Sequence, residues 1–136
     1  MNGCQIQIST DGCTLDFIPG TLLGGTVTHS CGLDRSISYF LEFVTWIVPI
    51  IKFTITLQLE GLTNHPADPS VDYIRYSSVN LFRKFQYGES TEINIIRRGY
   101  APTGGGLVVF VCHPLLSIPS IDLTDIGSFI KVRGTV

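Results

Sequence analysis

Residues 52–60 have the sequence KFTITLQLE, in which polar and apolar side chains alternate. In a β-strand this period of two places all the apolar side chains on one face, which should lie against a core. These apolar residues are Phe53, Ile55, Leu57 and Leu59. The segments on either side, residues 33–48 and 69–88, repeat apolar side chains at three- and four-residue steps, as one face of a helix does. A strand between two amphipathic helices predicts a sheet covered by a helical layer.

Both helices carry signals for their ends. The first should run from Leu33 to Pro49, since proline cannot continue a helix. The second should begin at Asp68-Pro69, where the Asp68 carboxylate can cap free amides and Pro69 supplies a pre-set φ at the first helical position. Gly88 is expected to close this helix.

Further strands are predicted from alternation, β-branched residues and flanking turn signals. They comprise a hairpin of residues 5–8 and 14–18, strands at residues 22–29, 91–96 and 107–112, and the start of a strand at residues 129–136. The fold class is therefore α/β (α+β), a two-layer sandwich of two helices packed on a mixed sheet, with the order β-α-β-α-β-β after the hairpin. Residues 1–114 should form this sandwich module, and residues 115–136 a loop and the start of a further, truncated module.

Composition limits the classes of function. The chain has 136 residues, of which 44% are hydrophobic and 15% charged, below the typical charged share of about 25%. This balance indicates apolar surface intended for a partner or a missing domain. The formal net charge of −2 gives no general attraction to nucleic acid or to an anionic membrane. Without a signal peptide or a span of about 20 apolar residues, a soluble intracellular protein with no membrane partner is expected.

Neither cofactor nor metal ion is expected from the motifs. The four cysteines lack CxxC or metal-ligand spacing and are predicted to be reduced and buried. Asp68 and Asp72 could share one helical face and hold a cation, but helix capping and the helix dipole explain acids there without a metal. We therefore assign no metal ligand.

The most unusual string is RGYAPTGGGLV, residues 98–108. Three consecutive glycines cost backbone entropy and need a reason. One hypothesis is a loop that cradles phosphate; yet the string leads into a strand, and it lacks the dinucleotide and P-loop spacings. The favoured hypothesis is a tight turn at which backbones approach closely.

This string resembles the signature of the RNA 3′-terminal phosphate cyclase superfamily. The matching positions are Arg98, Gly99, Pro102, Gly104, Gly105 and Gly106. Other family-like strings, at residues 19–25, 61–64 and 68–73, follow the family's order, so the resemblance covers almost the whole chain as an internal fragment of a larger cyclase-like fold. Details are nearer to the family's non-catalytic processing factors. Asp68 stands where cyclases tend to carry Ala, and Glu42 where they usually carry Gln.

The resemblance implies a function in ribosome biogenesis. A processing factor of this kind acts in the nucleus and nucleolus, within the small-subunit processome, where it supports early pre-rRNA cleavage and binds a GTPase and other processome proteins. The family's AMP-accepting histidine lies in a downstream segment, so none of His29, His65 and His113 inherits that role and no catalytic residue is assigned. A fragment of an ATP-dependent cyclase and a non-functional truncation remain as alternatives.

Basic residues are few and clustered, and they are the candidate contacts with pre-rRNA or a partner. These are Arg83, Lys84, Arg97, Arg98, Lys131 and Arg133. Tyr87 and Tyr100 lie near two of the clusters and could stack on bases. A solvated rim beside the strand ends is the competing interpretation. For Trp46, core packing is favoured over exposure to a missing part of the protein.

Overall fold

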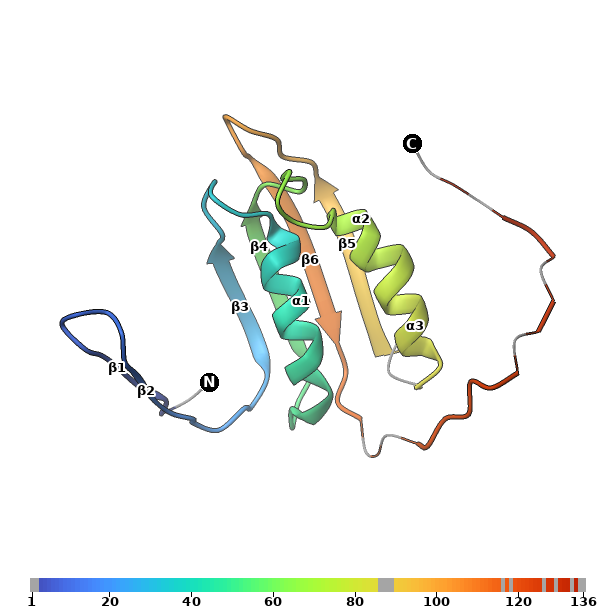
Figure 1. Ribbon diagram of the computed structural model, residues 1–136, viewed down its shortest axis with the longest axis horizontal. Helices are drawn as coiled ribbons and strands as arrows, with labels where there is room; N and C mark the ends of the chain where they lie inside the picture. The colour runs from blue at the N-terminus through green and yellow to red at the C-terminus, as the bar shows by residue number, and fades with distance from the viewer. Residues whose placement is uncertain are drawn as a thin grey trace.

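The computed structural model describes residues 3–85, 90–115, 117, 119–125, 127, 128, 130–132 and 134. Its strands are β1 (Gln5–Ile8), β2 (Leu15–Ile18), β3 (Gly25–Ser30), β4 (Ile55–Gly61), β5 (Thr91–Arg97) and β6 (Gly106–Cys112). Its helices are α1 (Ile37–Ile47), the 3₁₀ turn η1 (Val48–Ile50), α2 (Val71–Tyr73), the π segment η2 (Ile74–Ser78) and α3 (Val79–Arg83). Figure 1 shows how they follow one another.

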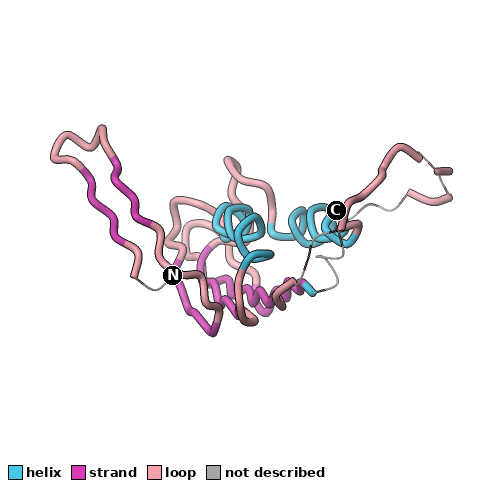
Figure 2. The backbone as a smooth tube through the Cα atoms, turned by 90° about the horizontal axis from the view of Figure 1, so that it is seen from below, coloured by secondary structure: helices cyan, strands magenta, loops and turns pink. Residues whose placement is uncertain are grey.

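The sandwich is built on a four-stranded mixed sheet with the order β3-β4-β6-β5. Strands β3 and β4 are parallel, whereas β6 is antiparallel to both β4 and β5. Parallel neighbours need a long crossover, and α1 supplies it between β3 and β4. Both helical segments lie on one side of the sheet (Figure 2). The predicted fold class, two helices on a mixed sheet in the order β-α-β-α-β-β, is confirmed.

The core lies between the helices and this one covered face. On β6, Gly106, Val108, Phe110 and Cys112 are buried while the residues between them are only half-buried. The sequence of β6 is continuously apolar, but it alternates in burial because only one face of the sheet carries helices. The other buried apolar residues are Cys31, Ile37, Leu41, Val48, Ile51, Leu57, Leu59, Leu62, Val71, Ile74, Val79 and Ile93.

The first helix and the strand after it are shorter than predicted. Helix α1 begins after Ser36, whose hydroxyl accepts a hydrogen bond from the Ser38 amide, so Leu33 lies outside it in a half-exposed loop. Strand β4 begins at Ile55, and Phe53 is 63% exposed. Before β4 the backbone of Phe53 passes close to Gly24, where an added Cβ would be 2.3 Å from the carbonyl oxygen of Phe53.

The second helix also begins later than predicted. Its N-cap is Ser70, which accepts a hydrogen bond of 3.1 Å from the Tyr73 amide, and the first helical residue is Val71. The predicted cap at Asp68 is therefore wrong, because that carboxylate binds other partners. The helix contains the five-residue π segment η2, which the sequence pattern did not indicate. The expected stop at Gly88 lies outside the described residues.

Two other predictions need correction. Trp46 is not in the core: it is 73% exposed, and its indole meets the ring of Phe82 edge-on at 6.1 Å between centroids. The strand predicted for residues 129–136 is absent from its described members, 130–132 and 134, where Ile130 is 95% exposed and no neighbouring strand offers hydrogen bonds. Arg133 lies outside the described residues.

The predicted hairpin is confirmed as an antiparallel pair, β1 and β2, that projects from the sandwich (Figure 1). Its register pairs Ile6 with Phe17 and Ile8 with Leu15, so four apolar side chains share one face, and all four are exposed. Within the described ranges, no helix has the length and apolar character needed to cross a bilayer.

We expect Phe110→Ala to lower the free energy of unfolding by about 3 to 5 kcal/mol, because the ring is fully buried and its removal leaves a cavity. Urea unfolding followed by circular dichroism measures this change. Phe43→Ala is the matched control: that ring is 67% exposed, and its loss should change stability by less than about 0.5 kcal/mol. Equal losses for both variants would contradict the assignment of the core.

Candidate functional site

The family-like glycine string forms the turn between β5 and β6, and its ends touch the end of β4. A Cβ added to Gly99 would lie 2.2 Å from the amide nitrogen of Gly106 and 2.4 Å from the carbonyl oxygen of Gly61. One added to Gly106 would lie 2.6 Å from the same Gly61 oxygen. Three backbones therefore meet where no side chain fits, which confirms the close-approach hypothesis.

The tip of this turn uses glycine for a different reason. Gly104 and Gly105 have φ values of +69° and +80°, in the left-handed region that side chains disfavour. The Gly104 amide donates to the Tyr100 carbonyl at 2.8 Å and closes the turn, and Pro102 follows a cis peptide bond within it. The Arg97 guanidinium donates from Nε to the Gly105 carbonyl.

Thr63 fastens the turn to the loop after β4. Its buried hydroxyl donates to the Gly99 carbonyl at 3.0 Å and accepts from the Gly99 amide at 3.3 Å. The Thr63 amide donates to the same carbonyl at 2.8 Å. The sequence reasoning did not select Thr63; its place in the family-like string at residues 61–64 was the available signal.

Arg98 binds the second helix through a two-pronged ion pair. Its Nη1 lies 2.6 Å from Asp72 Oδ2 and its Nη2 lies 3.0 Å from Asp72 Oδ1. These hydrogen bonds lower the pKa of the Asp72 carboxyl and raise the pKa of the guanidinium. Arg98, which was predicted as a candidate RNA contact, thus forms an ion pair with Asp72 within the chain.

Asp68 joins the loops before the two helices. Arg35 donates from Nε to both carboxylate oxygens, at 3.0 and 3.1 Å, and also from Nη2. The Ser36 amide donates to Oδ2 at 2.8 Å, and His65 Nδ1 lies 3.7 Å from this oxygen. The Asp68 side chain is only 2% exposed, and the hydrogen bonds from Arg35 lower its pKa most. We call this set of contacts the Asp68 clamp.

Asp68 and Asp72 therefore have separate arginine partners and do not converge on a shared cation. Among the residues that the structure describes, no group of three or more His, Cys, Asp or Glu side chains could hold a metal ion. Beside the clamp, Asn64, His65, Pro66, Asp68 and Ser70 line a cavity of about 250 Å³. The buried Asn64 Oδ1 accepts no hydrogen bond from the described residues.

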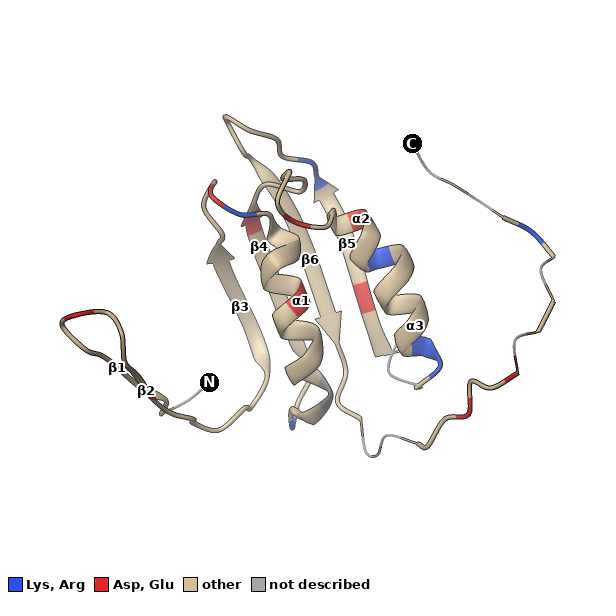
Figure 3. Cartoon of the chain, viewed as in Figure 1, with Lys and Arg blue, Asp and Glu red and all other residues tan. Residues whose placement is uncertain are grey.

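The predicted basic contacts are not brought together. Arg83 and Lys84 lie at the end of α3. Arg97 is the last residue of β5 and Arg98 follows it, at the far end of that strand, while Lys131 lies in the C-terminal tail. Figure 3 shows these basic positions well apart on the chain. The described basic residues therefore do not form a single RNA-binding patch.

The histidines and cysteines are also dispersed. The predicted burial of the cysteines is confirmed for Cys31 and Cys112 and wrong for Cys4 and Cys13, which are exposed. The His29 ring packs on Phe40 at 5.4 Å, while His113 Nδ1 lies 2.9 Å from the Thr54 hydroxyl. Burial raises the pKa of the Cys31 thiol to about 11, so this sulfur is protonated at neutral pH. At Cys112, the sulfur lies within hydrogen-bond distance of the Thr91 hydroxyl and of the His113 carbonyl. These contacts do not form a cysteine–histidine catalytic pair.

The two-layer sandwich and the glycine turn Arg98–Gly106 are the features that the sequence resemblance predicts for the cyclase family. Comparison with known families tests this assignment. The family model of RNA 3′-terminal phosphate cyclase matches residues 1–128. The chain belongs to the RNA 3′-terminal phosphate cyclase family.

Within this family the chain is similar to proteins named cyclase-like. It is 42% identical over 134 residues to the RNA 3′-terminal phosphate cyclase-like protein of Homo sapiens, a match that covers 98% of the chain and 36% of the relative. It is 38% identical over 135 residues to the rRNA processing protein rcl1 of Schizosaccharomyces pombe, with 98% and 37% covered. The chain thus spans little more than a third of the length of these relatives.

We expect Gly99→Ala to destabilise the fold by about 1 to 3 kcal/mol, because the new methyl group would overlap backbone atoms that cannot rotate away. Thermal unfolding followed by circular dichroism tests this. Gly134→Ala is the control, since its added Cβ would meet nothing within 4 Å. A Gly99→Ala protein as stable as the Gly134→Ala protein would show that the three backbones are not in close contact.

The Asp68 clamp predicts a pH dependence. An aspartate with a lowered pKa stabilises the folded state above its unfolded value of about 3.9, and this contribution is lost as pH falls through the folded value. Asp68→Asn should therefore reduce the free energy of unfolding by about 1 to 2 kcal/mol at pH 7 and flatten its decline between about pH 5 and pH 2. Urea titrations across that range measure both effects.

The control for this experiment is Asp16→Asn, which neutralises an exposed aspartate on β2. It should leave the stability at pH 7 within about 0.5 kcal/mol of the parent chain. If Asp68→Asn and Asp16→Asn behave alike at every pH, the clamp does not stabilise the fold.

Proposed function

We propose that this chain is part of a cyclase-like factor of ribosome biogenesis, which supports rRNA processing as a binding scaffold without cyclase activity. Support comes from the similarity to an rRNA processing protein and to several cyclase-like proteins across almost the whole chain. We further propose that the parent protein supports early pre-rRNA cleavage and small-subunit biogenesis in the nucleolus.

The observation that carries this proposal is the similarity to an rRNA processing protein over 98% of the chain. The ion pairs of Asp68 and Asp72 with arginines give both carboxylates a structural role. General acid–base catalysis works best with a group whose pKa lies near the working pH. Both carboxyls have their pKa lowered by an ion pair, which moves them away from that range. Asp68 is also one of the residues that resemble the processing factors, and the clamp gives it a structural role that alanine could not fill.

Exposed apolar side chains support a scaffold. Tyr39, Phe43, Trp46 and Ile50 follow one another along the outer side of α1 and η1, and each is at least 46% exposed. Large exposed aromatic residues of this kind are typical of surfaces that meet other proteins. The partners that we propose are a ribosome-biogenesis GTPase and other processome proteins, with pre-rRNA as a further contact through the exposed basic residues.

The test is association in cells. A tagged full-length parent protein should co-sediment with pre-ribosomal particles on a sucrose gradient and should carry pre-rRNA in the same fractions. The variant Asp68→Arg, which places a cation opposite Arg35 and breaks the clamp, should lower the co-sedimenting share several-fold, whereas Asp16→Asn should not. Pre-rRNA is measured by hybridisation in each fraction.

Two outcomes would contradict the proposal. One is a parent protein that sediments only as free protein, with no pre-rRNA in its fractions. The other is conversion of a 3′-phosphorylated RNA to its 2′,3′-cyclic phosphate by the purified parent protein with ATP, which would assign it to the enzymatic branch of the family.

A further inference from the structure

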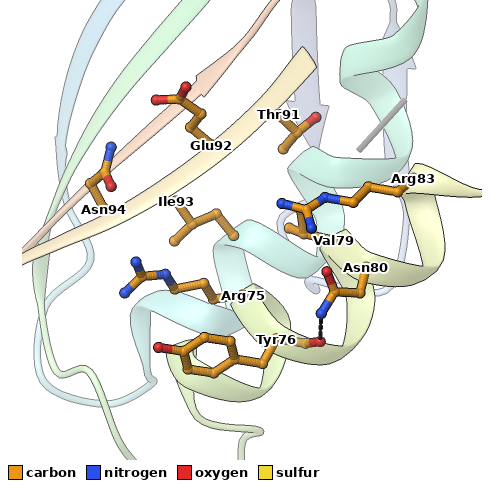
Figure 4. A pocket seen from close by; sticks show the side chains of 9 residues that line it. All are labelled: Arg75, Tyr76, Val79, Asn80, Arg83, Thr91, Glu92, Ile93 and Asn94. Atoms are coloured by element: carbon orange, nitrogen blue, oxygen red, sulfur yellow. Dashed lines mark hydrogen bonds between the residues drawn. The ribbon is translucent and has the colours of Figure 1, made fainter. Parts of the chain in front are cut away.

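A groove lies between the second helical layer and the outer strand of the sheet. Its volume is about 350 Å³, and one wall comes from η2 and α3 while the other comes from β5. This volume falls within the range of about 300 to 1,000 Å³ typical of ligand sites. The lining residues, drawn in Figure 4, are Arg75, Tyr76, Val79, Asn80, Arg83, Thr91, Glu92, Ile93 and Asn94.

The strand wall of this groove is a free sheet edge. Strand β5 pairs with β6 on one side, and no described strand pairs with its other side. The His113 amide donates to the Ser90 carbonyl, so alternation along the antiparallel ladder turns the amides and carbonyls of Ile93 and Ile95 toward the free edge. Such an edge is a template for another strand.

The helical wall of the groove is basic. Arg75 and Arg83 direct their guanidinium groups from the helix toward β5 (Figure 4). Within the part of the chain that the structure describes, neither has a carboxylate within salt-bridge distance. Arg75 comes from the π segment η2, and segments of this kind are frequent at functional sites. The Arg75 guanidinium also lies over the Tyr76 ring, 5.3 Å from its centroid. Two arginines that form no salt bridge among the described residues, beside a free edge, complement an acidic strand.

The spacing of the two arginines sets the spacing of the acids. Arg75 and Arg83 are eight residues apart, about 12 Å along the axis of an ideal α-helix and somewhat less here because η2 is a π segment with a smaller rise. Four residues of an extended strand cover about 13 Å, and residues four apart in a strand face the same side. A strand seated on β5 would therefore offer one carboxylate to each arginine from positions i and i+4. Glu92, which is exposed on β5, would repel an acid placed on the opposite face.

We propose that this groove binds an extended acidic peptide, which adds a strand to the free edge of β5 and places acids at positions i and i+4 against Arg75 and Arg83. The peptide backbone bonds to Ile93 and Ile95, and its carboxylates face the helical wall. This inference goes beyond the proposed function and does not depend on it, because it rests on the lining of the groove and on the hydrogen-bonding groups of β5 alone.

The experiment uses the purified 136-residue chain and fluorescent peptides of equal composition. One peptide has Glu at positions i and i+4 in a Thr/Val background, and a permuted peptide has Glu at i and i+3, which face opposite sides of a strand. Fluorescence anisotropy should show saturable binding of the first and at least about five-fold weaker binding of the second. Hydrogen exchange should slow at the amides of Ile93 and Ile95 when the first peptide binds.

Variants and a modified peptide separate charge from strand pairing. R75Q/R83Q should weaken binding of the i, i+4 peptide by about five- to tenfold. K52Q/K131Q, which removes the same charge from exposed lysines elsewhere, should leave the affinity unchanged. N-methylation of alternate residues on the edge that faces β5 should abolish binding while it keeps every carboxylate.

The inference is overturned if the folded chain, verified by circular dichroism, binds no acidic peptide. It is also overturned if the permuted and N-methylated peptides bind as well as the first, since the contact would then be charge attraction alone. Binding of a single-stranded oligouridylate that R75Q/R83Q abolishes, in the absence of peptide binding, would assign the groove to nucleic acid instead.

Discussion

The contact among the backbones of Gly61, Gly99 and Gly106 is the constraint on which the rest of this molecule depends. It holds the end of β4 against both ends of the turn between β5 and β6, and the Thr63 hydroxyl locks it from the adjoining loop. Because β4 and β6 are the two central strands, this contact sets the register of the whole sheet. A Cβ at Gly99 or Gly106 would overlap the carbonyl oxygen of Gly61, so both positions require glycine.

Two ion pairs extend this constraint to the helices. Arg98 leaves the same turn to bind Asp72 at the start of the second helix, and the Asp68 clamp ties the entry of that helix to the entry of α1. Loops that are normally the mobile part of an α/β sandwich are here linked to one another by charged hydrogen bonds. These hydrogen bonds hold the loops at this end of the sheet together. The family motif at Arg98–Gly106 thus has a structural role in this chain.

Much of the fold could be predicted because the spacing of apolar residues along a strand or helix shows which of its faces is buried. The alternation of residues 52–60 and the helical spacing on either side indicated a mixed sheet under two helices. The helix starts could not be predicted, because Ser36, Asp68 and Ser70 compete as caps and only the fold decides which carboxylate or hydroxyl meets which amide. Trp46 lies off the apolar stripe of Ile37, Leu41 and Val44, and this position did indicate exposure. The usual preference of tryptophan for packed sites was given more weight, and the structure shows that the position on the helix decides.

The order of the strands has a consequence for synthesis. Among the strands that the structure describes, β6 is the last to be made, yet it pairs with both β4 and β5, so its hydrogen bonds supply most of this sheet. A nascent chain that has not yet released residue 112 holds β4 and β5 without their shared neighbour, and the apolar faces of both helices stay open to water. This unit therefore cannot fold strand by strand from the N-terminus during synthesis. Between the synthesis of β4 and of β6, about fifty residues of elongation, the strands stay exposed and chaperones can bind them.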